Sequence, residues 1–439
     1  MECIIPSYET SYLGVAQALK PQKLSQHCGT VSTMLNRSLI SGLRPVANLR
    51  ASLALPAIQY RRFSISPAHS FSAVFAETKN PQLNEILTEI QEKIILPAHL
   101  PEKARKLVFN PDKSDYIQRN PVTIEVDGLE HTFKTIDRFH DVPNSMKAFA
   151  EATKLMKTKE EWDNISTLLA GYKKAGIKLK RWHADAVTRR AGHHGQPYVV
   201  IECAQQVEKT GLSLQRDCTV ILLLASINRK IISPKGEESE TQQALKWNKM
   251  VWDIIQRPEH LAKNTPPRRQ PHMNPVIRGM ILFSQASAVK EQQAAGAPVD
   301  DLIRELRDNV EFITSAWAER ESDDLTSSPY LNPINSRVKP NSDNYVPERQ
   351  HVSPFNYILT LTENIRAIEL AQEIIGEDAK DLQPIHDLME KHIEDFVMMS
   401  PDKNSFGWDM AYERVTGRQP SWKQHLPAAP RPRNDVEDN

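Results

Sequence analysis

The sequence predicts an all-α protein, an α-solenoid of helical hairpins with a small β-hairpin near its N-terminal end. Three observations lead to this prediction. Apolar residues recur at three- and four-residue spacing over most of the chain. A short motif returns after 35 residues. Glycine is scarce, 15 of 439 residues, while proline reaches 30, a balance that suits helices divided by proline-marked loops.

Residues 1–70 have the composition of a mitochondrial transit peptide. Glu2 and Glu9 are the only acids before Arg61, whereas basic residues, serine and threonine are spread throughout. The Arg-x-Phe-x-x-Ser pattern from Arg61 to Ser66 resembles a two-step processing site. We therefore expect a cut after Arg62, removal of an octapeptide, a mature chain that begins near Phe71, and localisation in the mitochondrial matrix. The alternative is a basic N-terminus that carries no address.

Residues 71–144 are expected to hold a helix and a β-hairpin. Apolar spacing predicts a helix from Asn80 to Lys106, which Pro97 and Pro101 end or interrupt. Two alternating stretches then flank Asp127-Gly128, a dipeptide typical of two-residue hairpin turns. These stretches are Val122–Val126 and Leu129–Phe133.

Residues 145–320 are predicted to form the helical-repeat array. The motif Lys-x-Gly-x-x-Leu ends at Leu179 and again at Leu214, so Gly176 and Gly211 lie 35 residues apart. Each glycine is expected to close a helix with a positive φ. Helices are predicted from Arg181 to Ala191 and from Pro197 to Lys209 between them, and further along from Val276 to Ala295 and Val299 to Arg320. Seven apolar residues should be buried between units: Leu168, Leu169, Val187, Val200, Val207, Leu222 and Leu223.

The period and the Gly-x-x-Leu ending resemble the pentatricopeptide repeat over about two units, although Leu179 and Leu214 stand where that family usually has proline. The alternative is a chance likeness of two helical hairpins. In members that read RNA base by base, the resemblance places Asp185 and Val220 at a base-reading position. Val220 cannot hydrogen-bond a base edge, so the resemblance implies architecture more than sequence readout.

The C-terminal part is predicted to contain a linker, a helical pair and a tail. Residues 321–352 are polar and rich in proline, asparagine and serine, which is typical of a linker. Residues 353–400 are expected to form two helices divided at Gly376. Residues 401–439 are predicted to be an extended tail that aromatic side chains anchor on a partner surface. Those side chains are Trp408, Tyr412 and Trp422.

Catalytic, cofactor and metal motifs are not apparent in the sequence. Phosphate loops, Gly-x-Ser-x-Gly and His-Glu-x-x-His are missing, so no enzyme activity, cofactor or small-molecule substrate is predicted. His193-His194 could ligate a metal, but a solvated turn is the preferred interpretation. Cys203 and Cys218 are expected to be buried free thiols. Apolar runs are too short to predict a membrane span.

A local basic cluster is the candidate RNA-binding site. The whole chain balances 55 basic against 55 acidic residues, so any RNA contact must come from such a cluster. A solvated helix face is the alternative interpretation. The candidates are Lys173, Lys174, Lys178, Lys180, Arg181, Arg189 and Arg190.

Together, the address, the helical hairpins and the lack of catalytic motifs resemble the mitochondrial small-subunit ribosomal proteins of the pentatricopeptide-like kind. The chain is similar in particular to the fungal version from the foot region of the subunit. The resemblance implies a structural role with small-subunit rRNA and ribosomal proteins as partners. Two other functions stay open: a free mitochondrial RNA-processing or translation factor, and a matrix enzyme or assembly factor.

Overall fold

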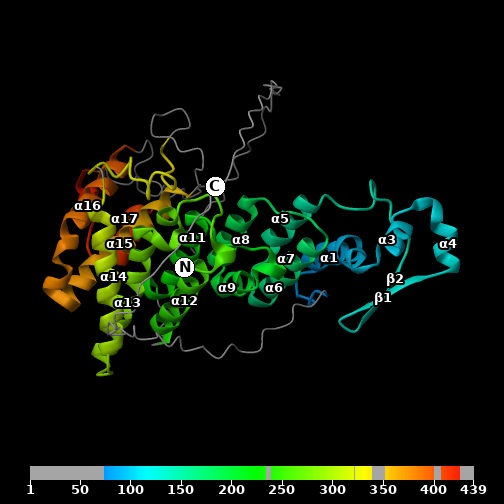
Figure 1. The fold of residues 1–439 in the computed structure, drawn as a ribbon, viewed down its shortest axis with the longest axis horizontal. Helices are drawn as coiled ribbons and strands as arrows, with labels where there is room; N and C mark the ends of the chain where they lie inside the picture. The colour runs from blue at the N-terminus through cyan, green and yellow to red at the C-terminus, as the bar shows by residue number, and fades with distance from the viewer. Residues whose placement is uncertain (1–73, 234–238, 321, 339–351, 400–406, 426–439) are drawn as a thin grey trace, which may run out of the picture. The chain divides into compact units, whose positions relative to one another are not determined.

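The computed structural model describes residues 74–233, 239–320, 322–338, 352–399 and 407–425, and the predicted leader lies outside them. Helices make up most of this part of the chain, and its one sheet has two strands (Figure 1). The all-α class predicted from apolar spacing is therefore confirmed. Among these residues, none of the helices has both the length and the apolar character that crossing a bilayer requires.

The predicted N-terminal helix is present and is interrupted at its first internal proline. Helix α1 (Pro81–Ile90) begins where the Asn80 side chain caps its first turn. It continues as a π-helical turn (Gln91–Ile95) and the short α2 (Leu96–His99). Pro97 has no N–H to donate to the carbonyl four residues earlier, so the regular ladder is broken at this point.

The segment before α1 is fastened to the helical array by one buried side chain. Asn164, which is 2% exposed, lies between α6 (Lys159–Asp163) and α7 (Ile165–Lys174). Its Nδ2 donates to the carbonyl oxygen of Ala76 at 3.0 Å, and the Ala76 N–H donates to its Oδ1 at 2.8 Å. The amide therefore satisfies both backbone groups of Ala76.

The predicted β-hairpin is confirmed. Strands β1 (Val122–Val126) and β2 (Leu129–Phe133) pair antiparallel, with Val122 opposite Phe133. Asp127 and Gly128 have φ values of 53° and 80°, the two positive values that a type I′ turn requires.

Two isolated strands are marginally stable, and this hairpin packs with α3 (Glu102–Val108) and α4 (Ser114–Arg119) around a small core of its own. The buried residues of this core are Leu96, Leu100, Val108, Ile117, Phe133 and Ile136.

Residues 145–320 consist of successive helices, many of which begin at a capping side chain or a proline. Asn144 caps α5 (Ser145–Leu155), and prolines occupy the first position of α9 (Pro197–Gln205) and α13 (Pro275–Ala294). In addition to α6 and α7, the helices are α5 (Ser145–Leu155), α8 (Arg181–His193), α9 (Pro197–Gln205), α10 (Val207–Thr210), α11 (Asp217–Ile232), α12 (Ser239–Ile255), α13 (Pro275–Ala294) and α14 (Asp300–Ala318).

The two repeat glycines close their helices as predicted. Gly176 follows α7 with φ 75°, and Gly211 follows α10 with φ 74°. After α7 the Ile177 N–H donates to the carbonyl oxygen of Tyr172, which completes a Schellman closure. Helix α7 packs against α10, and α8 packs against α11. Elements that the 35-residue offset relates are therefore neighbours, while the repeat assignment itself stays a prediction.

The burial prediction is confirmed for six of the seven apolar residues and is wrong for Val207. Val207 is only half-buried because the helix is broken before it: Gln206 has φ −114° and ψ 42°, so α10 starts as a separate short turn. The six confirmed residues are each at most 6% exposed: Leu168, Leu169, Val187, Val200, Leu222 and Leu223.

The predicted C-terminal helices are α15 (Pro354–Ile375) and α16 (Gln383–Met398), with Gly376 between them at φ 56°. Helix α15 packs against α13. Residues 322–338 of the predicted linker have neither helix nor strand, but they are fixed to the core by buried apolar residues. These are Leu325, Leu331 and Ile334.

The predicted extended tail requires a correction. Residues Trp408–Thr416 form helix α17, which packs against α15. Trp408, Tyr412 and Trp422 are 6%, 0% and 0% exposed and belong to the main core. These rings anchor the segment on the chain itself, so they are not free to anchor it on a partner surface.

Candidate nucleic-acid interface

The predicted RNA-binding residues lie along one continuous stretch: the last turn of α7, the connection of residues 175–180, and α8. Asp185 is the only acidic residue between Lys173 and Arg190. Positive charge is therefore concentrated over this stretch although the whole chain is neutral.

The connection between α7 and α8 exposes its lysines because apolar and basic residues alternate along it. Ile177 and Leu179 pack against the main core, whereas Lys178 and Lys180 are exposed. In an extended segment successive side chains point to opposite sides, so the two lysines share the outer side. Lys174, Arg181 and Arg189 are exposed as well.

Two of the seven predicted residues bond within the chain. Lys173 Nζ donates to the carbonyl oxygen of Val207 at 2.8 Å and to that of Glu208. Arg190 Nη1 donates to the carbonyl oxygen of Ala150 at 3.0 Å and to Thr153 Oγ1 at 2.7 Å. Both side chains join helices of the array, which leaves five candidates for phosphate contact: Lys174, Lys178, Lys180, Arg181 and Arg189.

The two residues that the pentatricopeptide resemblance assigns to base reading make contacts within the chain itself. Asp185 Oδ2 pairs with Arg216 Nη1, and its Oδ1 accepts from Thr219 Oγ1 at 2.5 Å. Val220 is fully buried. Neither side chain is presented to a base edge, which agrees with the expectation that the resemblance concerns architecture more than readout.

One surface residue of this stretch was missed by the sequence interpretation. Trp182 is 53% exposed in the first turn of α8 and is flanked by the cations. The signal was present, since an aromatic residue amid Lys178, Lys180 and Arg181 is a pattern found in nucleic-acid-binding surfaces. The sequence alone could not show whether the ring is turned inwards or outwards.

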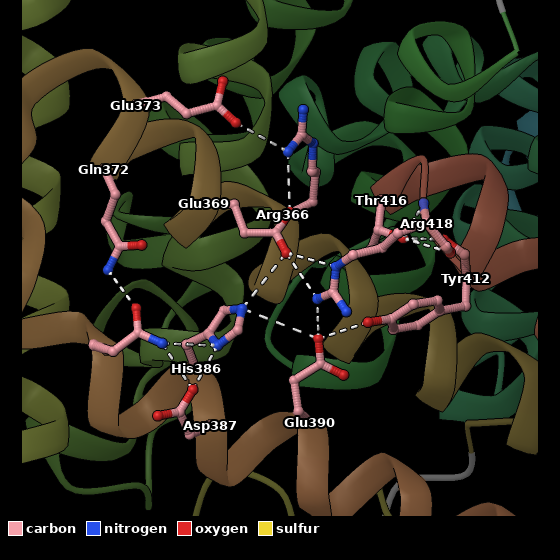
Figure 2. A network of polar contacts seen from close by, with 11 residues as sticks. Arg366, Glu369, Gln372, Glu373, His386, Asp387, Glu390, Tyr412, Thr416 and Arg418 are labelled. Atoms are coloured by element: carbon pink, nitrogen blue, oxygen red, sulfur yellow. Dashed lines mark hydrogen bonds and ion pairs between the residues drawn. The ribbon is translucent and has the colours of Figure 1, made fainter. Parts of the chain in front are cut away.

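A separate polar cluster joins α15, α16 and α17 (Figure 2). Glu369, His386 and Glu390 offer ligand atoms within 4.8 Å of one another, the spacing of a possible metal site. Arg418, however, donates to Glu369 Oε1 at 2.8 Å and also binds Glu390. The guanidinium therefore supplies the positive charge between these carboxylates, and Tyr412 Oη donates to Glu390 at 2.6 Å.

The pKa shifts in this cluster follow from these contacts. Burial alone would raise the pKa of Glu369, but hydrogen bonds from His386, Arg418 and Arg366 outweigh it and lower the pKa to about 2. Burial alone would lower the pKa of His386, and hydrogen bonds to Glu369 and Asp387 raise it overall. The cluster is thus an ion network that fastens the C-terminal segment to α15 and α16.

The predicted thiols and histidine turn are ordinary parts of the fold. Cys203 and Cys218 are buried free cysteines, as expected, and burial raises the pKa of both thiols. His193 ends α8 and is exposed, while the half-buried His194 ring lies 6.4 Å from the Trp162 ring.

Comparison with known proteins places this architecture in a family. A family model described as mitochondrial ribosomal protein mS27 matches residues 61–414. The small ribosomal subunit protein mS27 of Neurospora crassa is 33% identical over 191 residues, which cover 43% of this chain and 48% of that protein. The chain thus spans about half the length of this curated relative. Both descriptions agree with the mitochondrial small-subunit resemblance read from the sequence, and they confirm the mitochondrial localisation predicted from the leader. Because the family model spans most of the chain, the chain belongs to the mitochondrial ribosomal protein mS27 family.

Proposed function

We propose that the protein is a structural, non-catalytic component of the small subunit of the mitochondrial ribosome. In this role it binds rRNA and neighbouring ribosomal proteins through a helical-repeat scaffold. The family match over residues 61–414 carries the proposal, and the name of the Neurospora crassa relative supports the assignment to the small subunit.

The scaffold part of the proposal is supported by the packing of related elements. Helix α7 lies against α10 and α8 against α11, and these pairs are the ones that the 35-residue offset relates. Stacked helical hairpins present one helix of each unit on a continuous surface, which gives a long contact area for large partners.

The rRNA part is supported by the exposed cations of the α7–α8 stretch. Lysine and arginine side chains bind phosphates and release condensed counterions, so such binding weakens as salt rises. Asp185, the one acid in this stretch, is already paired with Arg216 and does not offset the exposed charge.

The ribosomal-protein part is supported by an apolar side chain on a fixed turn. Phe139 is 90% exposed. Asp137 holds the turn, because its Oδ1 accepts from the N–H groups of Phe139 at 2.8 Å and His140 at 3.3 Å. An exposed aromatic ring on a turn that is held by hydrogen bonds is suited to fill a pocket of a protein partner, as interface anchor residues do.

Sedimentation of mitochondrial lysate at graded salt tests the proposal. The full chain should co-sediment with the small subunit at moderate salt and be released at high salt or after RNase treatment. Reversing four exposed cations of the stretch should lower the salt needed for release, because it removes contacts to phosphates. The fold should be retained, because exposed charges add little to its stability. These reversals are Lys178→Glu, Lys180→Glu, Arg181→Glu and Arg189→Glu.

A matched control reverses two lysines and two arginines that are also exposed but lie outside the stretch: Lys103→Glu, Arg105→Glu, Lys113→Glu and Arg119→Glu. This control should sediment like the unmodified chain. A chain found only in light, ribosome-free fractions would contradict the proposal.

A further inference from the structure

Trp182 is a large aromatic side chain, 53% exposed, at the start of α8 and amid exposed cations. We infer that its indole is a stacking platform for an unpaired base of RNA, while the flanking cations contact the phosphates of the same strand. The inference rests on the proposed rRNA binding and names the kind of RNA that this stretch takes.

The indole ring is held in place before any ligand arrives. It stacks on the His183 ring with centroids 3.6 Å apart and an angle of 24° between the planes. His183 is 1% exposed, its Nδ1 accepts from the Lys180 N–H at 3.0 Å, and its ring meets Phe149 edge-on at 5.5 Å. A ring fixed by a buried neighbour loses little conformational entropy on binding.

The charges around Trp182 fit a nucleic-acid strand. Lys178, Lys180 and Arg181 precede the ring and are exposed. Arg189 is seven residues further along α8, so it lies on the same helix face about 10 Å away along the axis. Asp185 also lies on this face, but its carboxylate is bound by Arg216 and Thr219.

This combination favours RNA over a protein partner. Lysine is depleted in protein–protein interfaces, yet two of the cations nearest to Trp182 are lysines. Aromatic rings set among cations are the common feature of proteins that bind single strands. An indole stacks only on a base that has left its own helical stack, so the ligand is a single-stranded loop, bulge or end.

Binding of the purified full chain to two RNA probes tests the inference. One probe is a short single-stranded oligoadenylate, and the other is an RNA duplex of the same length. Trp182→Ala should weaken binding of the single strand about tenfold or more, without changing its salt dependence or duplex binding. Trp182→Phe, which keeps a stacking ring, should retain most of the affinity.

Tyr116→Ala is the matched control, since Tyr116 is 51% exposed but lies in α4, outside the basic stretch. It should bind both probes like the unmodified chain. Unchanged single-strand binding by Trp182→Ala, with weaker binding by the four charge reversals, would overturn the inference and leave the proposed function intact.

Normal RNA binding by Trp182→Ala together with its loss from the sedimenting small subunit would place a protein on the ring, and would also overturn the inference. Failure of the unmodified chain to bind either probe would overturn both the inference and the rRNA part of the proposed function. Trp182 is largely exposed, so helix content measured by circular dichroism should be unchanged in every variant.

Discussion

Glu363 is a buried carboxyl group of α15 that bonds the first of two linked amides. It is 0% exposed, Asn228 Nδ2 donates to its Oε2 at 2.7 Å, and Asn248 Nδ2 donates to Asn228 Oδ1 at 2.7 Å. Burial raises the pKa of Glu363 to about 8, although the Asn228 hydrogen bond and the Arg229 charge act in the opposite direction. The folded chain therefore holds a proton that the unfolded chain releases.

Because of this proton, we expect the contribution of Glu363 to the free energy of unfolding to fall as pH rises. Between the ordinary pKa of 4.5 and the raised value of about 8, the native state binds more protons than the unfolded state. The contribution of Glu363 to the free energy of unfolding should decrease by at most about 1.4 kcal/mol per pH unit across this window. Glu363→Gln, which resembles the protonated form, should remove that slope, as measured by urea unfolding at several pH values.

The exposed Glu311→Gln is the control for this experiment and should keep the pH profile of the unmodified chain. Parallel profiles for Glu363→Gln and the unmodified chain would show that the carboxyl group is charged in the folded state.

The basic cluster shows what can and what cannot be predicted from the sequence for individual residues. The basic cluster follows from composition alone, because seven cations and one acid lie between Lys173 and Arg190. The internal roles of Lys173 and Arg190 do not, since their acceptors lie 34 or more residues away along the chain. Local spacing predicts which residues share a face, and it contains no information on which distant backbone oxygen meets that face.

At the scale of elements, α13 and α15 approach closely at one glycine. A Cβ on Gly279 would lie 1.8 Å from Asn364 Oδ1. The Asn364 amide cannot easily turn away, because its Nδ2 donates to the carbonyl oxygens of Val276 at 3.1 Å and Thr360 at 2.8 Å.

We expect Gly279→Ala to destabilise the fold by about 1–3 kcal/mol through this overlap. Asn364→Ala should also destabilise it, by removing buried hydrogen bonds. The double variant should lose less than the sum of the two, because shortening Asn364 makes room for the new methyl group. Urea unfolding measures all three, and strictly additive losses would mean that the helices separate instead.

A second prediction at this scale concerns the ion pairs that hold the C-terminal segment on α15. Arg418→Ala removes the cation between Glu369 and Glu390, and should destabilise the docking of α17 on α15 by on the order of 1 kcal/mol, since Arg418 is partly exposed. Hydrogen exchange of the Trp408–Thr416 amides should become faster. Arg257→Ala, which breaks only a pair with Asp253 within four residues, should leave these amides unchanged.

Within this network, the contribution of Glu369 has a pH dependence of opposite sign to that of Glu363. The pKa of Glu369 is lowered from 4.5 to about 2, so its stabilising contribution is present above about 4.5 and is lost as pH falls towards 2.

Equal exchange rates in the Arg418 variant and the unmodified chain would contradict the role given to the network.

Elements with strong local signals were predicted, and those that depend on distant packing were not. Asp127-Gly128 specifies its own turn, and Gly176 and Gly211 specify their own helix ends. Helix α17 has only nine residues in a segment rich in arginine and proline, and a helix this short is not specified by its own sequence without tertiary packing. Its burial comes from pairing with α15, a long-range contact that no local pattern encodes.

At the scale of the whole molecule, import should remove the leader close to Arg62 or Ser70. This prediction rests on the Arg61–Ser66 pattern within an acid-poor N-terminal stretch. N-terminal sequencing of the protein isolated from mitochondria measures the cut directly. A mature chain that keeps residues before Gln59 would rule out this processing site.

The hydrogen bonds between Asn164 and Ala76 limit how far such trimming can go. If a protease removed Ala76, the Asn164 amide would lose both backbone groups that it bonds. The loss of two such hydrogen bonds costs about 1–3 kcal/mol in total. An overshortened chain would thus be a less stable protein, and matrix quality control would have a physical basis for telling it from a correctly cut one.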